Sequence, residues 1–417
     1  MVGTGQGRAR GTELVVLLLA INCLNMLDRN LPFILAEAIK GDIGLTDKEL
    51  GLLGGVVFAL VYSVGGLPLG RLADRGFARQ TVAGAVTLWS AMTAIGSAAQ
   101  SFLHLAGARL GVAAGEAALA PAAHAIISEH FPPERRATMI SIFSIGTPVG
   151  FMIGLAFGGW LVEHVGWRAT FLAIGVPGLL LGLLAWWRLP RVETPPPVQE
   201  GIGDALRFLL SRRSFRHTLA AASLYSFVGY SLNTFLPAFV MRSHGLGAAE
   251  TGLWLGLGTG AAGLIGMPLS GWLADRMAAR DPGWRLRIPA LLMGASAPFL
   301  MAALLVDHWG MAIALIFVPL MLTYAYLGPT FSAMHAIVPP RMRATATSCL
   351  LGGLTLFGAS LGPLLVGAIS DWLSIAHGQH ALALALLILP VVLLLSAWQF
   401  GVAARNLAPD LYHESAE

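Results

Sequence analysis

Long apolar runs recur along the whole chain, and each run is closed by charged residues or by proline and glycine. A run of about 18 or more apolar residues can cross the roughly 30 Å hydrocarbon core of a bilayer as a helix. Counting such runs predicts twelve membrane-spanning helices. They lie near residues 13–36, 49–70, 79–99, 103–128, 137–162, 168–188, 215–241, 250–272, 286–306, 309–333, 342–368 and 379–403.

The composition supports an all-α integral membrane protein. Residues of the AVILMFWYC set make up 56% of the chain, charged residues only 12%, and the mean hydropathy is +0.72. An ordinary soluble domain is less apolar and carries about 25% charged residues. The two cysteines, Cys23 and Cys349, fall in separate apolar runs. We therefore expect neither a disulfide framework nor a metal site.

The placement of the basic residues predicts the orientation in the membrane. Of the 26 lysines and arginines, twenty fall on one side of the predicted spans, and Arg29 and Arg109 lie inside them. The other four, Lys40, Lys48, Arg168 and Arg242, fall on the opposite side. Because cytoplasmic loops carry the excess of basic residues, the richer side is cytoplasmic. With an even number of spans, both termini lie there.

Two sequence motifs repeat between the halves of the chain. The segment 68–75 is matched by 268–276, and 131–138 is matched by 338–345, in the same order. Such matches indicate a duplicated six-helix unit, the build of many secondary transporters, whose substrate site lies near the membrane midplane.

A proline run within Leu189–Gly201 cannot continue a helix and predicts a linker between the halves. Apolar residues at helical spacing from Ile202 to Leu210 predict a short amphipathic helix after it. The predicted parts are a cytoplasmic tail 1–12, a six-helix half 13–188, a linker 189–214, a six-helix half 215–403 and a cytoplasmic tail 404–417.

Four charged residues lie inside predicted spans of the first half. Asp28 and Arg29 are adjacent in the first span, and Arg109 and Glu116 lie seven residues apart, hence on one face, in the fourth. We take the first span as centred near Asn25 and the fourth near Glu116. A helix rise of 1.5 Å per residue then places Asp28 about 4.5 Å and Arg109 about 10 Å outward of the membrane midplane, so the charges can share one polar layer. Intramembrane charges are costly and by default mark a functional site.

Opposing effects act on a carboxylate in such a layer. Low dielectric favours its protonated form, whereas a nearby arginine favours the ionised form, and the balance makes a proton switch. Asp28 and Glu116 are the candidates. The alternative is structural: the charges only lock helices together, with Glu116 tied to Arg29 or Arg109.

The spans of the second half carry no formal charge at this depth. They offer hydroxyls, amides and aromatic rings, and the candidate substrate-binding residues there are Tyr225, Tyr230, Asn233 and Tyr324. Each could instead be a hydrogen-bonded packing residue. A cavity lined in this way suits an amphipathic molecule whose polar head faces the first half.

Asp74 and Asp275 lie in equivalent cytoplasmic loops after spans two and eight, next to Arg75 and Arg276. An acid there can accept hydrogen bonds from the N-terminus of a helix in the opposite half. Such contacts would close the cytoplasmic side, so we expect gate residues. Positive-inside anchoring explains the arginines but not the acids.

Several motifs resemble a known transporter family. The sequence Gly-Arg-Leu-Ala-Asp-Arg-Gly-Phe-Ala-Arg at 70–79 resembles the loop signature of the major facilitator superfamily, although the second copy has Met277 where the first has Gly76. More narrowly, four segments are similar to bacterial members of the Spinster branch: 25–29, 44–53, 108–117 and 166–168. The Asp-Arg pair of the first span also occurs in organic-anion members.

The resemblance implies a fold of twelve helices in two pseudo-symmetric halves, in the bacterial inner membrane, as a monomer. It implies proton-coupled transport by alternating access of a sphingosine-1-phosphate-like lipid or lysophospholipid. Asp28 and Glu116 would carry protons, Arg29 and Arg109 would pair with them or contact the head group, and Arg75 and Arg79 would support the gate.

Rival functions differ in class. A small organic anion or a drug is the rival cargo, because arginine binds carboxylates well. An enzyme acting on lipids is not expected, since the sequence has neither a His-Glu-x-x-His zinc helix nor a Gly-x-Ser-x-Gly elbow. A transport-dead sensor would be supported by a long soluble appendage. We expect no cofactor and no nucleic-acid partner.

Overall fold

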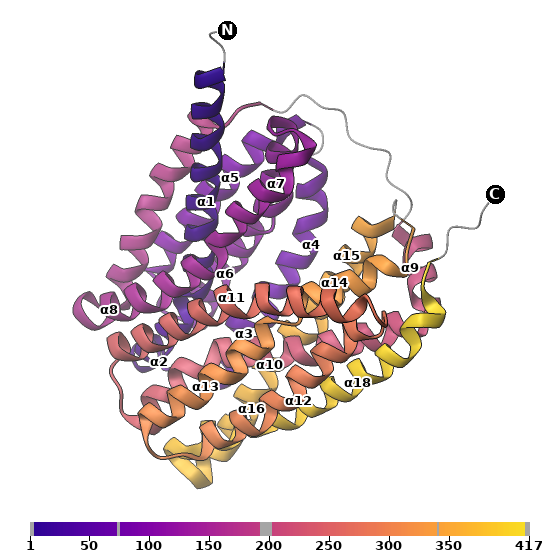
Figure 1. The fold of residues 1–417 in the computed structure, drawn as a ribbon. Coiled ribbons are helices and arrows are strands. Elements are labelled where there is room, and N and C mark those ends of the chain that lie inside the picture. The colour runs from indigo at the N-terminus through magenta and orange to yellow at the C-terminus, as the bar shows by residue number, and fades with distance from the viewer. Residues whose placement is uncertain (1–3, 73–75, 192–201, 340–341, 413–417) are drawn as a thin grey trace, which may run out of the picture. The chain divides into compact units, whose positions relative to one another are not determined.

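The computed structural model describes residues 4–72, 76–191, 202–339 and 342–412, and it is helical nearly throughout. The helices are α1 (Thr4–Ile34), α2 (Ala36–Ile43), α3 (Asp47–Gly54), α4 (Val56–Leu72), α5 (Ala78–Gly96), α6 (Phe102–Glu116), α7 (Leu119–His130), α8 (Pro133–Arg188), α9 (Ile202–Ser211), α10 (Arg213–His244), α11 (Ala248–Ala278), α12 (Trp284–Leu305), α13 (Trp309–Tyr324), α14 (Leu327–Ala336), α15 (Arg343–Gly353), α16 (Ser360–His377), α17 (Ala381–Leu386) and α18 (Ile388–Asp410) (Figure 1). A π-helical turn, η3 (Leu354–Ala359), joins α15 to α16, and a 3-10 turn, η4 (Gly378–His380), precedes α17.

Helices cover each of the twelve predicted spans. Within the described ranges, eight helical stretches are long and apolar enough to cross a membrane. Two of them, Thr138–Arg188 and Cys349–Asp410, run 51 and 62 residues, and each covers most of two predicted spans. The two remaining predicted spans are covered by α5 and α10.

The long helix α8 is two spans joined at a sharp break. Gly166 has φ 78° and ψ 164° inside it, far from helical values. A positive φ of this kind is open to glycine and costly for residues with a Cβ. The chain thus reverses direction between its fifth and sixth spans without a long loop.

The chain forms two compact units by its internal contacts. The first, unit 1, comprises Met1–Leu45, Val57–Pro197 and Gly247–Leu257. The second, unit 2, comprises Thr46–Val56, Val198–Leu246 and Gly258–Glu417. Two short segments therefore pack with the half to which they do not belong in sequence: α3 lies in unit 2, and the start of α11 lies in unit 1.

Each unit has its own apolar core. In unit 1, α8 packs against both α1 and α5, around fully buried side chains that include Trp89, Ile21 and Ile126. In unit 2, α18 packs against α10 and α12, and the largest fully buried rings include Phe215, Phe235 and Phe400.

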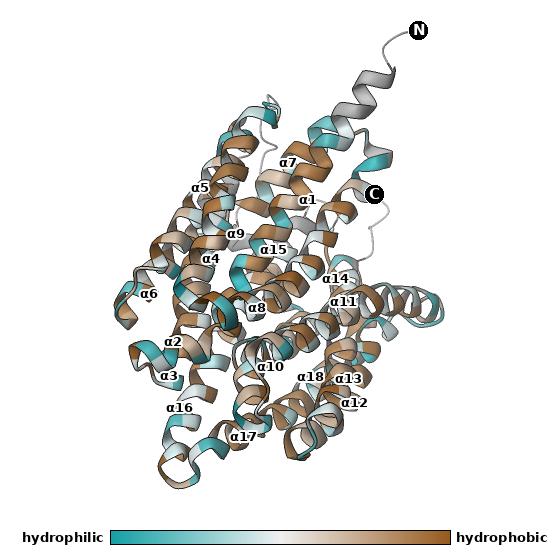
Figure 2. Cartoon of the chain, turned by 90° about the vertical axis from the view of Figure 1, so that its left-hand side faces the viewer, coloured by the Kyte–Doolittle hydropathy of each residue, from teal (hydrophilic) through white to brown (hydrophobic). Residues whose placement is uncertain are grey.

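Many large apolar side chains remain on the outside. Ile375 is 90% exposed, Trp372 74% and Trp187 73%. Figure 2 shows the hydrophobic colour dominating long helices such as α12 and α13. Apolar surface of this extent is stable when it faces lipid rather than water.

Candidate functional site

The four predicted intramembrane charges come together inside unit 1. Arg29 on α1 donates from Nε to Oε2 of Glu116, the last residue of α6, over 2.7 Å. The Glu116 side chain is fully buried and that of Arg29 is 16% exposed. Of the two partners that the sequence left open for Glu116, the structure selects Arg29 for the direct ion pair.

Asp28 lies beside this pair with only one oxygen satisfied. It is 2% exposed, and its Oδ1 accepts a 2.6 Å hydrogen bond from the hydroxyl of Thr93 on α5. Its Oδ2 is buried and has no hydrogen-bond partner among the described residues. Glu116 and Arg109 are the charged groups that act on it. An oxygen in this position can take a proton without losing a protein contact.

Arg109 is buried in the same layer, at 6% exposure. Its guanidinium makes one long hydrogen bond, 3.4 Å, to the backbone oxygen of Arg29, and its Nε has no partner within the described chain. The guanidinium carbons of Arg109 and Arg29 lie 4.9 and 5.0 Å from the ring centre of Phe58, and Arg29 is also 4.6 Å from that of Tyr62. Aromatic faces on α4 thus help stabilise the buried Arg109 and the partly buried Arg29.

The local sequence of α6 explains how Glu116 reaches this layer. Gly115 sits where a Cβ would lie 2.9 Å from the backbone oxygen of Ala85 and 3.0 Å from the amide nitrogen of Trp89. The absence of a side chain lets α6 approach α5 closely at this point. The helix then ends, and Ala117 and Ala118 link it to α7.

The second unit holds a group of aromatic side chains. Tyr225, Tyr230 and Asn233 are half-buried on α10, as predicted, and the side chain of Tyr324 lies outside the described part of the chain. Tyr326, which the sequence analysis did not select, is 4% exposed with its ring 4.2 Å from that of Tyr225. The only hint in the sequence was that Tyr326 follows the predicted site residue Tyr324 by two positions.

The predicted gate is only partly described. Asp74, Arg75 and the side chain of Asp275 lie outside the described residues. Arg79 on α5 stacks over the ring of Trp186 at 5.2 Å, and Arg276 on α11 stacks over Trp272 at 5.5 Å. Both arginines therefore contact aromatic side chains of their own unit.

An acid–base cluster in unit 2 was missed. Asp47, the first residue of α3, is 3% exposed, and both of its oxygens accept 2.7 Å hydrogen bonds from the guanidinium of Arg242 on α10. Ser370 on α16 donates to the same carboxylate at 2.7 Å. These residues are far apart in sequence, so no spacing pattern could have linked them.

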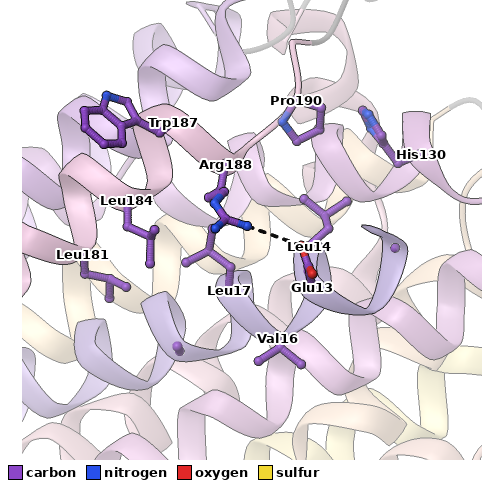
Figure 3. Close-up of a pocket in the computed structure, with 12 residues that line it drawn as sticks. Glu13, Leu14, Val16, Leu17, His130, Leu181, Leu184, Trp187, Arg188 and Pro190 are labelled. Atoms are coloured by element: carbon purple, nitrogen blue, oxygen red, sulfur yellow. Dashed lines mark ion pairs between the residues drawn. The ribbon is translucent and has the colours of Figure 1, made fainter. Parts of the chain in front are cut away.

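Unit 1 also has a cavity of about 1000 Å³ at the N-terminal end of the first span, between α1 and the C-terminal end of α8. Figure 3 shows its apolar wall, which includes Leu17, Leu181 and Leu184, and an ion pair at its rim. That pair joins Glu13 to Arg188 at 3.6 Å, and His130 lies nearby. The sequence analysis predicted no site there.

Comparison with known proteins places the chain in a family. The sequence profile of the Major Facilitator Superfamily matches residues 18–349. An MFS-type efflux pump of Mycolicibacterium smegmatis is 37% identical over 413 residues, which cover 98% of this chain and 96% of the pump. Protein spinster homolog 1 of Mus musculus is 28% identical over 402 residues, covering 88% of this chain and 74% of that protein.

Solved structures agree. A bacterial homologue of the human lysosomal transporter Spinster, in an inward-facing and unoccupied conformation, has a TM-score of 0.87 and 28% identity, with 97% of this chain and 99% of that chain covered. The predicted fold and the predicted resemblance are confirmed, and the protein is a transporter rather than an enzyme. The chain belongs to the Major Facilitator Superfamily.

Proposed function

We propose that this secondary transporter moves an amphipathic molecule with an anionic head, of the lysophospholipid or sphingosine-1-phosphate kind, and couples the movement to protons. The observation that carries the proposal is the buried Arg29–Glu116 pair with the half-satisfied Asp28 beside it.

The formal charge of the layer explains the coupling. With both acids ionised, Asp28 and Glu116 balance Arg29 and Arg109, and the layer is neutral. Protonating Glu116 breaks its ion pair with Arg29 and leaves one net positive charge in a region of low dielectric. An unbalanced buried charge is costly, so an anionic head group that pairs with Arg29 stabilises this protonated state. Proton and anion binding therefore favour each other.

The cavity of unit 1 between α1 and the end of α8 supports a lipid-like cargo. Its wall is apolar, while Glu13, Arg188 and His130 make its rim polar. A tail gains free energy from such a wall, whereas a small water-soluble anion gains little. Arg188 at its rim is one of the basic residues from which the cytoplasmic side was predicted, so we propose that the cavity lies on that side. We propose that cargo reaches the transporter from the inner leaflet through this cavity.

The uncharged aromatic group of unit 2 also favours a cargo with an apolar part. Tyr225 and Tyr326 pack together there, and we propose that Tyr225, Tyr230, Asn233 and Tyr324 contact the cargo.

A small organic anion is the second candidate. Two buried guanidiniums in one layer suit a carboxylate as well as a phosphate. A relative named as a probable L-galactonate transporter of Escherichia coli is 26% identical over 397 residues, which supports this alternative.

A chain-length series distinguishes the two cargoes. For lysophospholipids with one head group, we expect affinity to rise by up to about 0.8 kcal/mol per added methylene, about fourfold in Kd, because each methylene leaves water. Binding to purified protein can be measured by thermal shift, with short organic anions as the control series. Flat affinity along the series, together with stabilisation by the short anions, would favour the organic anion.

We also propose that Asp74 and Asp275 belong to a cytoplasmic gate, with Arg75, Arg79 and Arg276 beside them. Asp74→Asn removes the negative charge that a helix N-terminus attracts, so the state closed to the cytoplasm should lose population. Spin labels on cysteines at the repeat-related Thr138 and Thr345 would report a shift to longer distances. With Glu129→Gln as control, an identical distance distribution in Asp74→Asn would remove Asp74 from the gate.

A further inference from the structure

Two helix N-termini on the predicted extracellular side are each held by an acid from another helix. In unit 2, Asp371 on α16 accepts from the amides of Asp47 and Lys48, at 2.9 and 2.8 Å. In unit 1, Glu163 on α8 accepts from the amide of Ala249 at 2.8 Å. The free amides and the positive end of a helix dipole make such positions favourable for a carboxylate.

The two contacts occupy equivalent positions in the duplicated unit. The offset of 201 residues that relates the two aspartate-containing loops also takes Lys48 to Ala249. The offset of 207 residues that relates the segments starting at 131 and 338 takes Glu163 to Ser370, next to Asp371. The same contact thus occurs twice, once in each compact unit.

Glycines at matching positions allow both pairs of helices to touch. In unit 2, a Cβ on Gly51 would collide with the backbone oxygen of Pro363, and one on Gly367 with that of Asp47. These helices pack backbone against backbone, which leaves no space for a side chain between them.

In unit 1, a Cβ on Gly252 would collide with the backbone oxygen of Leu155, and one on Gly159 with that of Ala248. Gly252 is the repeat equivalent of Gly51, at the same offset of 201 residues. Acid, helix start and glycine contact therefore recur as one set.

Each set joins the two halves of the sequence. The helix α3 follows the first span but packs on α16 in unit 2, and the start of α11 belongs to the second half but packs on α8 in unit 1. Alternating access requires the halves to part on one side of the membrane at a time. Contacts between segments of different sequence halves are therefore candidates for contacts that form and break during each cycle.

We propose that Glu163 and Asp371 are two symmetry-related latches that hold the extracellular ends of the halves together and release them when the transporter opens outward. They are positioning residues for transport and do not contact cargo. The proposal rests on the family and on these contacts, and it does not depend on which cargo is carried.

The latch of Asp371 is the stronger of the two. A capping box between Thr46 and Glu49 completes the hydrogen bonds at the start of α3, and Asp47 adds its buried pair with Arg242. The repeat equivalent of Asp47 is Ala248, which has no charge, and Glu163 is exposed. Asp371 should therefore control outward opening more than Glu163 does.

The test measures opening from outside in the full-length protein. With Cys23 and Cys349 replaced by alanine, Ser370→Cys places a thiol at a site that is 1% exposed beside the Asp371 latch. Its reaction rate with a membrane-impermeant maleimide then reports how often the extracellular side opens. Glu163→Gln and Asp371→Asn are compared singly and together. The control is Asp307→Asn, which neutralises an acid on the same predicted side but outside both latches.

We expect Asp371→Asn to speed labelling by about two- to fivefold, as loss of a charge–dipole contact predicts, Glu163→Gln by less, and the double variant by the most. Asp307→Asn should label like the parent. A melting temperature close to the parent's shows that faster labelling reports opening rather than unfolding. If the double variant labelled no faster than the parent, the proposal would be overturned. Equal rates in the double variant and Asp307→Asn would also overturn it. If the latch variants labelled faster but the protein bound no lysophospholipid, the proposed cargo would be refuted and the latches would stand.

Discussion

Glu116→Gln and Asp28→Asn are expected to abolish proton-driven accumulation of cargo in proteoliposomes. Each variant keeps the shape of the side chain but can no longer exchange a proton, and a ligand shifts the access equilibrium only by its differential affinity for the two states. Each variant removes one of the two proposed proton-carrying groups on which the pH gradient acts, and we expect coupling to need both. Asp307→Asn, an exposed acid outside the layer, is the matched control and should accumulate cargo as the parent does.

Binding should separate the roles of the charged residues. Glu116→Gln should alter cargo affinity more than Asp28→Asn, because Glu116 is the direct ion-pair partner of Arg29, the proposed head-group contact. Arg29→Ala should reduce both binding and transport, since it removes the partner of Glu116 and leaves a buried carboxylate uncompensated. If both neutralised variants still accumulate cargo under an imposed pH gradient, the charges are structural.

Breaking the Asp47–Arg242 pair is expected to cause the largest loss of stability. The pair is bidentate, with side chains only 4% and 15% exposed. Arg242→Gln leaves the Asp47 carboxylate buried without its arginine, and losing one partner of a buried pair costs about 3–5 kcal/mol. Removing both charges in Asp47→Asn with Arg242→Gln should cost less than Arg242→Gln alone.

Thermal unfolding of the purified variants measures this difference. The order expected for the melting temperature is parent, then the double variant, then Arg242→Gln. Arg168→Gln, which removes an exposed cation on the same side, is the control and should change stability little. If Arg242→Gln were as stable as the double variant, the unpaired Asp47 carboxylate would have no cost, and the prediction would be wrong.

The sequence predicted the features that depend on local pattern. Apolar runs of membrane length identify spans directly, and Asp28, Arg29, Arg109 and Glu116 stand out because charge is rare in such runs. Their common layer followed from helix rise alone, and the structure indeed brings them together.

The features that the sequence missed depend on tertiary contacts. The pairing of Asp47 with Arg242 joins residues that no periodicity relates, and Tyr326 gains meaning only through its ring contact with Tyr225. The exchange of α3 and the start of α11 between units also has no local signal. The repeat offsets did carry a hint, since they relate Lys48 to Ala249, but only the observed hydrogen bonds gave that relation a meaning.

The most direct test of the proposed coupling is proton uptake on binding. When lysophospholipid binds to purified protein in weak buffer above neutral pH, the account predicts that protons are taken up, because the head group takes Arg29 from Glu116 and the freed carboxylate is protonated. Glu116→Gln should bind with much smaller uptake. Binding without proton uptake in the parent, or equal uptake in the parent and Glu116→Gln, would contradict coupling at this ion pair.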